Sequence, residues 1–439
     1  MNQNNSKKYI MSNTKILFIS LYIIILYQPA LLHGYMAGDN VHFYRASYFW
    51  GEPRLERQNF SSFDALFGWG TSHSGRNSKG NKVPLLNVLG LHNMQQLGSQ
   101  VPNLDPNNPL DQILIDLTNI EPRSTFGKLE FNGRFQIIEL YLNAYHTIKN
   151  GFFVQANLPV RRLQLSKIHF KDKSPRDLIM PSQDTPAWQN FLSNFCQILQ
   201  RWHFKNVFTK KINAGVGDIS FMGGWTRNYV DTVYLDYVDV ASKIGILFPT
   251  GKKRDEDIPF DISLGYNGHW GVPFKFDIAF GMLDWLTLGG HIGVLFLIGK
   301  NRKIRMRTSS QQNGYIKLAR GNANVKPGSY FDFSLYTKAD HFFSGLSILF
   351  GYAFNYKEPD CIEPLNKLIF NTHVVNADRQ FKSFKQHIFQ FMVEYDYAKK
   401  LSDIGPRVTF FYNYLFAGQR TFNTSMKGFD VGFDIAWDF

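Results

Sequence analysis

Three side chains in the second half of the chain could act together in acyl transfer: Asp277, His291 and Ser334. A serine nucleophile needs an imidazole base, and that imidazole needs a carboxylate to orient it. Asp277 and His291 lie on either side of a short turn, so they would face each other if residue 277 paired with residue 291. This constellation would suit a hydrolase, but the same residues could equally form a polar group in a pore wall.

Other chemistry finds little support in the sequence. It contains no Gly-rich phosphate loop, no metal-ligand cluster and no Gly-x-Ser-x-Gly turn. We therefore expect no enzymatic activity, no cofactor and no metal, and we keep the hydrolase as the least favoured alternative.

A larger set of ionisable residues recurs at alternate positions of apolar segments. If they point inward, the acidic members of a lumen wall are Glu139, Asp218, Asp239, Asp277, Asp332, Glu394, Asp396, Asp430, Asp434 and Asp438, and the basic members are Arg161, Lys243, Lys275 and Arg407. This acidic excess predicts a preference for cations if a path is open. Alternatively, these residues pair with one another and plug the interior.

The elements that must position these residues are strands with two unlike faces. The C-terminal segment GFDVGFDIAWDF places Phe429, Val431, Phe433, Ile435, Trp437 and Phe439 on one face, with acidic or small residues on the other. Because side chains alternate along a strand, one face of this segment is apolar throughout. Similar segments of roughly ten residues match the length of a tilted membrane strand.

We place eleven strands near 128–148, 152–168, 215–228, 234–248, 271–283, 286–299, 327–337, 342–356, 387–397, 407–417 and 429–439. Bacterial single-chain barrels have an even number of strands, and residues 60–71 are the best twelfth candidate. Short and long links alternate between the strands. The prediction is an all-β, transmembrane, antiparallel up-and-down β-barrel of about twelve strands (range 10–14). Its short turns would be periplasmic and its long loops extracellular. Residues 261–268 could add strand structure above the rim.

Composition agrees with this class. The 439 residues include 41 Phe and 21 Tyr, and the mean hydropathy of −0.24 is not that of a helical membrane protein. Lys7, Lys8 and Lys15 precede an apolar run over 16–27, which predicts a signal peptide over 1–34 rather than an anchor helix. Residues 35–59 would then be a periplasmic arm or a hatch, and 60–439 the barrel. Cys196 and Cys361 could form one disulfide or stay as free thiols.

Two long loops are expected to carry structure of their own. Residues 72–125 are rich in leucine and would either plug the lumen or fold over the rim. The loop over 169–214 contains TPAWQNFLSNFCQILQRWHF, whose apolar residues recur at helical spacing. This helix would act as a lid, rest on the membrane interface or, most simply, pack on other loops.

One pair of motifs resembles a known family. GVGDISFMGGW (215–225) followed by VDVASKIGILFPTG (238–251) is similar to the meta-pathway phenol-degradation family of outer-membrane proteins, which is broadly similar to the long-chain fatty-acid transporters. The matching residues are Gly215, Gly217, Asp218, Pro249, Thr250 and Gly251. The resemblance implies a transporter of small, often hydrophobic compounds, and an N-terminal hatch. Phe433, Ile435, Trp437 and the terminal Phe439 likewise resemble the sorting signal that barrel-assembly machinery recognises.

The resulting expectation is a bacterial outer-membrane channel for passive uptake of small, possibly hydrophobic solutes. The alternative is a plugged barrel whose loops bind a surface. Basic loops such as KKRDED and KNRKIRMR would either be simply solvated or contact outer-membrane lipid and lipopolysaccharide or a partner surface. We expect no nucleic-acid partner, and the sequence does not predict an oligomeric state.

Overall fold

The computed structural model describes residues 60–101, 103–120, 126–174, 184–230, 235–282, 285–343, 345–397 and 404–436. These residues belong to one structural unit. The predictions made for the signal peptide, for the arm or hatch over 35–59, and for Trp437, Asp438 and Phe439 lie outside the described residues.

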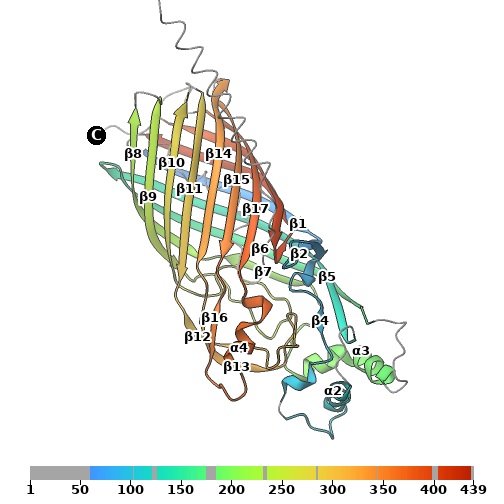
Figure 1. Ribbon diagram of the computed structural model, residues 1–439. Helices are drawn as coiled ribbons and strands as arrows, with labels where there is room; N and C mark the ends of the chain where they lie inside the picture. Colours follow the sequence, from blue (N-terminus) through green and yellow to red (C-terminus); the bar gives the residue numbers. More distant parts are fainter. Residues whose placement is uncertain are drawn as a thin grey trace, which may run out of the picture. The chain divides into compact units, whose positions relative to one another are not determined.

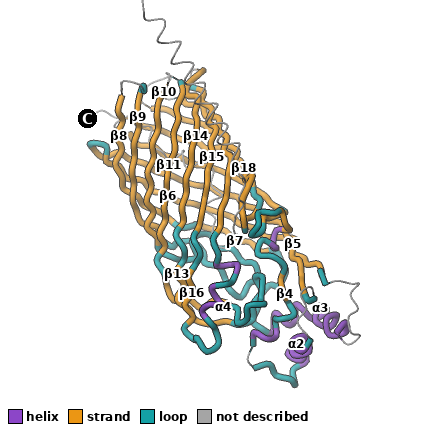
Figure 2. The backbone as a smooth tube through the Cα atoms, viewed as in Figure 1, coloured by secondary structure: helices purple, strands orange, loops and turns teal. Residues whose placement is uncertain are grey.

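Twelve antiparallel strands form a closed barrel (Figures 1 and 2). In chain order they are β1 (Phe60–Ser72), β5 (Lys128–Lys149), β6 (Phe152–Asp172), β8 (Ile219–Val230), β9 (Tyr237–Phe248), β10 (Gly271–Met282), β11 (Leu286–Leu297), β14 (Tyr330–Phe343), β15 (Leu346–Lys357), β17 (Phe384–Asp396), β18 (Ile404–Gln419) and β20 (Ser425–Ala436). Each strand pairs with the next along the chain, and β1 closes the barrel by pairing with β20. The predicted barrel and its strand number are confirmed.

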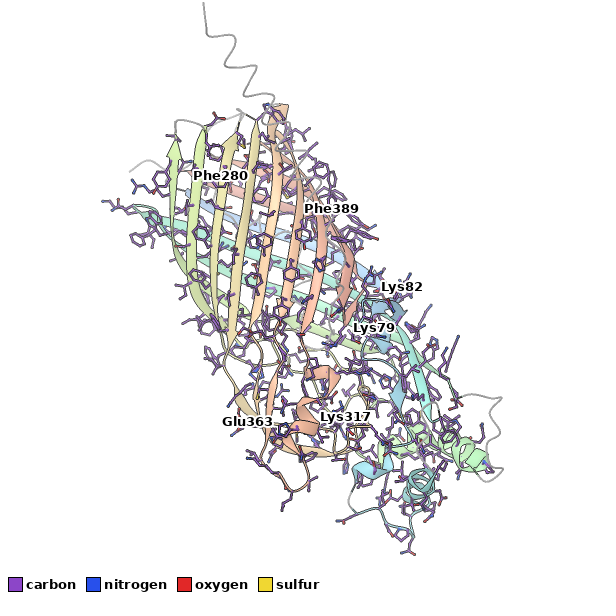
Figure 3. All side chains as sticks on the ribbon, viewed as in Figure 1. Lys79, Lys82, Phe280, Lys317, Glu363 and Phe389 are labelled. Atoms are coloured by element: carbon purple, nitrogen blue, oxygen red, sulfur yellow. The ribbon has the colours of Figure 1, made fainter. Side chains whose placement is uncertain are left out.

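Alternating burial shows why these segments form a barrel. On β20, Phe429, Val431 and Phe433 are 44%, 46% and 44% exposed, whereas Asp430 and Asp434 are each 1% exposed. Phe389 of β17 likewise lies on the outer surface, where Figure 3 labels it. The apolar face therefore points outward and the acidic face inward, the reverse of a soluble barrel with an apolar core.

The connections are short at one end of the barrel and long at the other, as predicted. At the short end, which we call the turn end, Asn150 and Gly151 alone join β5 to β6, with φ of 54° and 82°. Asn-Gly is the preferred pair for a two-residue hairpin because both positions need positive φ. The opposite end, the loop end, carries the long connections (Figure 1).

The loop end contains two small sheets and several helices. One sheet consists of β12 (Lys300–Arg305), β13 (Arg320–Lys326) and β16 (Cys361–Pro364), and the other of β2 (Ser74–Arg76), β3 (Lys82–Pro84) and β19 (Thr421–Phe422). The further elements are β4 (His92–Asn93), β7 (Lys211–Val216), the helices α2 (Pro109–Asn119), α3 (Asp184–Arg201) and α4 (Thr372–Asn376), and the 3-10 turns η3 (Leu85–Asn87), η4 (Gly98–Gln100) and η5 (Arg379–Phe381).

The helix predicted in the loop over 169–214 is present as α3. Its apolar face packs onto other loop elements: Phe191 and Phe195 are buried, and Trp188 Nε1 donates a hydrogen bond of 2.8 Å to Asp172. The neighbouring α2 begins after Asn108, whose side chain accepts hydrogen bonds from the amides of residues 110 and 111. The simplest of the three expectations for this helix, packing on other loops, therefore describes its position.

The strand structure considered for residues 261–268 is wrong. The segment is an irregular loop in which Ile262, Leu264 and Tyr266 are buried. Side chains take the place of a sheet partner: Asn213 donates to the Ile262 carbonyl (2.6 Å) and Arg161 to the Leu264 carbonyl (3.0 Å). Alternation alone could not reveal that these backbone groups are satisfied by side chains.

Within the described residues, no helix is both long and apolar enough to cross a membrane. Cys196 and Cys361 are exposed free thiols rather than a disulfide.

Candidate functional site in the barrel interior

Most of the predicted inward residues lie buried between the strands. Glu139, Asp218, Asp239, Lys243, His291, Asp332, Glu394, Asp396, Arg407, Asp430 and Asp434 are each less than 9% exposed, while Lys275 and Asp277 are partly buried. Because the alternate residues on the same strands are exposed and apolar, burial here means that the side chain points into the barrel.

Ionic contacts cross-link the inner wall near the turn end. Arg407 of β18 pairs with Asp64 of β1 and lies 3.7 Å from Glu394 of β17. Lys338 of β14 reaches the other oxygen of Glu394 at 3.3 Å. Asn143 of β5 donates to Asp64 at 2.9 Å. A chain of polar contacts thus joins β5, β1, β18, β17 and β14.

This part of the wall is acidic. Asp396 lies opposite Arg407 in the strand register, and Asp430 and Asp434 lie on β20 beside the same residues. Five acidic residues, namely Asp64, Glu394, Asp396, Asp430 and Asp434, therefore accompany two basic ones, Lys338 and Arg407. We call these seven residues the acidic network.

Sequence reasoning missed two members of the acidic network. Asp64 lies opposite the apolar face of the predicted strand over 60–71, so alternation could have identified it. Lys338 was missed because the strand was expected to end near residue 337, whereas β14 continues to Phe343. Strand ends are the least certain part of such a prediction.

A second polar group lies on β9, β10, β11 and β14. The strand register places Asp277 opposite His291, and His291 opposite Ser334, so the condition set for this group is met. The Ser334 hydroxyl is 2.7 Å from His291 Nδ1, and His291 Nε2 is 3.0 Å from Asp332. Asp277 instead lies 3.5 Å from the Lys243 ammonium. The expectation that Asp277 would orient His291 is therefore wrong, because Asp332 is the carboxylate in contact with the imidazole.

Gly293 explains this exchange of partners. Asp332 lies opposite Gly293, and a methyl group on that glycine would come within 2.5 Å of the Asp332 carboxylate. Without a side chain at residue 293, Asp332 can turn toward His291, while Lys243 attracts Asp277. An ionised Asp332 selects the tautomer with the proton on Nε2, which leaves Nδ1 to accept the Ser334 proton. Ser334 is 0% exposed, so a substrate carbonyl has no access to its hydroxyl in this conformation.

The two motifs that carried the family resemblance interlock. Asp218 accepts hydrogen bonds from the backbone amides of Gly251 (2.8 Å) and Tyr266 (2.5 Å). Thr250 donates to the Gly217 carbonyl at 2.6 Å. Burial raises the pKa of Asp218, and the two amide hydrogen bonds act in the opposite direction. The Asp218 carboxylate thus joins two loops.

The remaining predicted residues have near neighbours of their own. Glu139 forms a 2.9 Å ion pair with Arg161. Asp239 accepts a 2.8 Å hydrogen bond from Asn228. Lys275 lies opposite Lys243 in the strand register. Of these three contacts, the one between Glu139 and Arg161 joins opposite charges, whereas Lys275 and Lys243 carry the same charge.

At the loop end the interior is apolar. Leu85, Leu86, Val88 and Leu89 are at most 1% exposed. They form one cluster with inward residues of the barrel strands, among them Phe135 and Met426 near the loop end and Leu66, Leu349 and Phe411 farther along the barrel. Leu86 packs over the inner face of β5 at Gly133. Of the two expectations for residues 72–125, packing against the interior describes this part of the segment.

Hydrogen bonds hold this apolar segment, residues 85–89, in place. Asn87 accepts from the Phe131 amide at 3.0 Å, and Asn132 accepts from the Leu85 amide at 3.4 Å. Arg379, from the connection after β16, donates to the Leu89 carbonyl at 2.9 Å. We call residues 85–89 the cap segment.

In the described part of the chain, no group of three or more His, Cys, Asp or Glu residues is arranged to hold a metal ion. The arrangement can attract cations, exclude water at the loop end and orient an imidazole.

No family model matches the chain, and no curated protein matches it. Solved structures do show similarity. An outer membrane channel from Pseudomonas putida F1 has a TM-score of 0.45 and 9% identity, covering 88% of this chain and 99% of the other. A mutant of the TodX monoaromatic hydrocarbon channel has a TM-score of 0.37 and 9% identity, covering 93% and 98%. The Ralstonia pickettii toluene transporter TbuX has a TM-score of 0.32 and 8% identity, covering 87% and 90%. At these values we rest the fold on the chain's own strand pairing and assign no family by likeness.

Proposed function

We propose that this protein is an outer-membrane channel for small, moderately apolar solutes, with a modest preference for cations. The observation that carries the proposal is the closed twelve-stranded barrel whose outward face is apolar and exposed while its inward face is polar and buried. Such a surface is stable in lipid and costly in water, since large exposed apolar areas favour association.

In this proposal the turn end faces the periplasm and the loop end faces outward. Residues 1–34 direct export and are removed. Phe433 and Ile435, which are 44% and 36% exposed on β20, form the described part of the assembly signal, completed by Trp437 and Phe439. Residues 35–59 precede β1, and in this proposal they serve as a periplasmic arm or as a hatch.

The solute meets two environments in series. The cap segment and its apolar neighbours favour compounds that leave water readily, and the acidic network favours positive charge. Burying each apolar side chain of the cap segment contributes about 1.5–3 kcal/mol before its ordering cost is subtracted. Displacing it is therefore slow, and we expect low conductance. The path uses the acidic network, Glu139, Asp239, Lys243, Lys275, Asp277, His291 and Asp332.

The plugged, surface-binding barrel is the second candidate. It is favoured by the same cap segment and by ion pairs such as Arg161–Glu139, which neutralise charge between neighbouring strands of the inner wall. A hydrolase is less favoured because the Ser334 hydroxyl is fully enclosed.

Placement is tested first. The mature chain should fractionate with outer membranes and migrate differently on detergent gels before and after heating. Recovery as a soluble monomer without detergent would contradict membrane insertion.

Single-channel recording in planar bilayers then tests transport. Wild type should show small conductance steps that aromatic or other moderately apolar solutes block. Replacing residues 85–89 with a Gly-Ser linker of equal length should raise the conductance, and the same replacement in the exposed tip over 365–369 is the control. Silence of both the wild type and the cap variant, with heat-modifiability intact, would leave the plugged barrel as the better description.

A further inference from the structure

Aromatic side chains mark the outer edge of the barrel at the loop end of β8, β9 and β10. Phe221, Phe248 and Trp270 form a run of rings, with centroid separations of 5.8 Å and 5.1 Å. Trp270 is 47% exposed and Phe221 is 55% exposed. Aromatic girdles of this kind lie at the boundary between hydrocarbon and headgroups in membrane barrels.

Two lysines lie one step beyond this girdle. The amide of Ile298, which is 58% exposed, donates to the Trp270 carbonyl at 2.8 Å. Two residues further along the same face, the Lys300 ammonium donates to the Gly268 carbonyl. A methyl group on Gly268 would come within 2.4 Å of Lys253 and 2.8 Å of the Lys300 ammonium. Both lysines therefore gather directly above the lipid-facing surface.

The positive charge of this cluster is poorly compensated. Among the described residues, neither Lys253 nor Lys300 forms an ion pair, although Asp218 exerts a weak attraction on Lys300. Burial, together with the neighbouring charges of Lys253 and Arg302, lowers the pKa of Lys300 to about 8. Holding like charges together in this way raises the free energy of the protein unless an anion binds between them.

We propose that Lys253 and Lys300, with Trp270 beneath them, form a site for the phosphate headgroup of an anionic membrane lipid. We call these three residues the headgroup patch. The two ammonium groups would donate to the phosphate oxygens, and the indole would contact the start of the acyl region. The inference rests on the membrane placement proposed above, but it needs no open lumen.

A lipid fits this site better than a free phosphate because of where the lysines lie. A small soluble anion would make no favourable apolar contact with the exposed side chains of Trp270, Phe221 and Ile298, which lie next to the charges. A headgroup phosphate, by contrast, is held by its acyl chains at the level of the aromatic girdle. The membrane therefore supplies the anion at high local concentration.

The test uses the mature protein purified in a zwitterionic detergent, with lipid A as the probe and native mass spectrometry to count bound lipid. The double variant Lys253→Gln, Lys300→Gln should bind lipid A about thirtyfold more weakly, because each lysine near a phosphate surface contributes about 1 kcal/mol. The matched control is Lys79→Gln, Lys82→Gln, which removes two exposed lysines beside β3 at the same end of the barrel (Figure 3). The control should bind within twofold of wild type.

Two further arms identify the ligand and the role of the indole. Inorganic phosphate at millimolar concentration should not displace lipid A, and displacement would reassign the site to a soluble anion. Trp270→Ala should weaken lipid A binding severalfold. Equal losses in the lysine variant and its control would overturn the inference by showing a general charge effect. Heat-modifiability of each variant separates these outcomes from a failure to fold as a membrane barrel.

Discussion

The acidic network allows the cation preference to be worked out in advance. The triple variant Asp277→Asn, Glu394→Gln, Asp434→Asn removes three negative charges with side chains of nearly the same shape. The acidic network contains five acidic and two basic side chains, and replacing Glu394 and Asp434 leaves three acidic side chains against the same two basic ones. Losing Asp277 also leaves Lys243 without its 3.5 Å partner.

A unit charge about 4 Å from a passing ion contributes about 1 kcal/mol in water, which corresponds to roughly a fivefold change in occupancy. Salt at 0.1 M screens charges over about 10 Å, so the three contributions do not add fully. We therefore expect the ratio of potassium to chloride permeability to fall about tenfold. The barrel should remain folded, because these residues face the interior rather than lipid.

The assay is the reversal potential of single channels under a tenfold KCl gradient. The control variant, Asp116→Asn, Glu358→Gln, Glu363→Gln, makes the same change in net charge with exposed residues of the loop end. Glu363 lies far from the barrel wall in Figure 3. An unchanged permeability ratio in the lumen variant, or an equal change in the control, would refute the assignment of selectivity to the inner wall.

Three further predictions address assembly, chemistry and pH. Deleting Phe439 should leave unfolded periplasmic protein, and a normal folded yield on a heat-shift gel would show that the sorting-signal resemblance misleads. A fluorophosphonate probe should not label Ser334 in the folded protein, because its hydroxyl is enclosed; labelling lost in Ser334→Ala but not in Ser347→Ala would revive the hydrolase. Burial, with Lys317 nearby, lowers the pKa of His92 from 6.5 to about 3, so the unfolded chain binds a proton that the folded loop region does not. Stability should therefore fall as pH drops from about 6.5 toward 3, and His92→Phe should remove this loss in limited proteolysis.

The strands and their register could be predicted from the sequence because both follow from one local rule. An apolar face of period two fixes which residues point outward, and a shift of one residue would reverse every side chain. The pairing of residue 277 with residue 291, on which the polar group depended, follows this rule. The same rule identifies most of the inner wall, since inward residues are simply those between the apolar ones.

Side-chain partners could not be predicted in this way. His291 contacts Asp332 rather than Asp277 because Gly293 leaves space on one side and Lys243 attracts Asp277 on the other. Both reasons involve residues on neighbouring strands, and neither alters the alternation. The apolar members of the inner wall, such as Leu349 and Phe411, were also missed, because they interrupt a face that was expected to be polar.

The cap segment shows a different limit. Its leucines predict that the segment is buried. The surface against which it packs depends on contacts between residues far apart in the chain, such as Asn87 with the Phe131 amide and Arg379 with the Leu89 carbonyl. No local pattern encodes which surface a long loop covers. Only the structure shows that Leu86 of this segment packs near Gly133 on the inner face of β5.

The cap segment and the acidic network act at different places along the barrel, and this separation makes the transport proposal testable in two parts. The cap segment contacts the wall near the loop end, whereas Asp64 and Arg407 join strands near the turn end. Sites that share no partners contribute almost independently. Replacing residues 85–89 should therefore raise the conductance with little effect on ion preference. Neutralising the acidic network should lower the cation preference with little effect on the conductance. A barrel in which both changes altered both properties would have a single constriction, with the cap segment and the acidic network in contact.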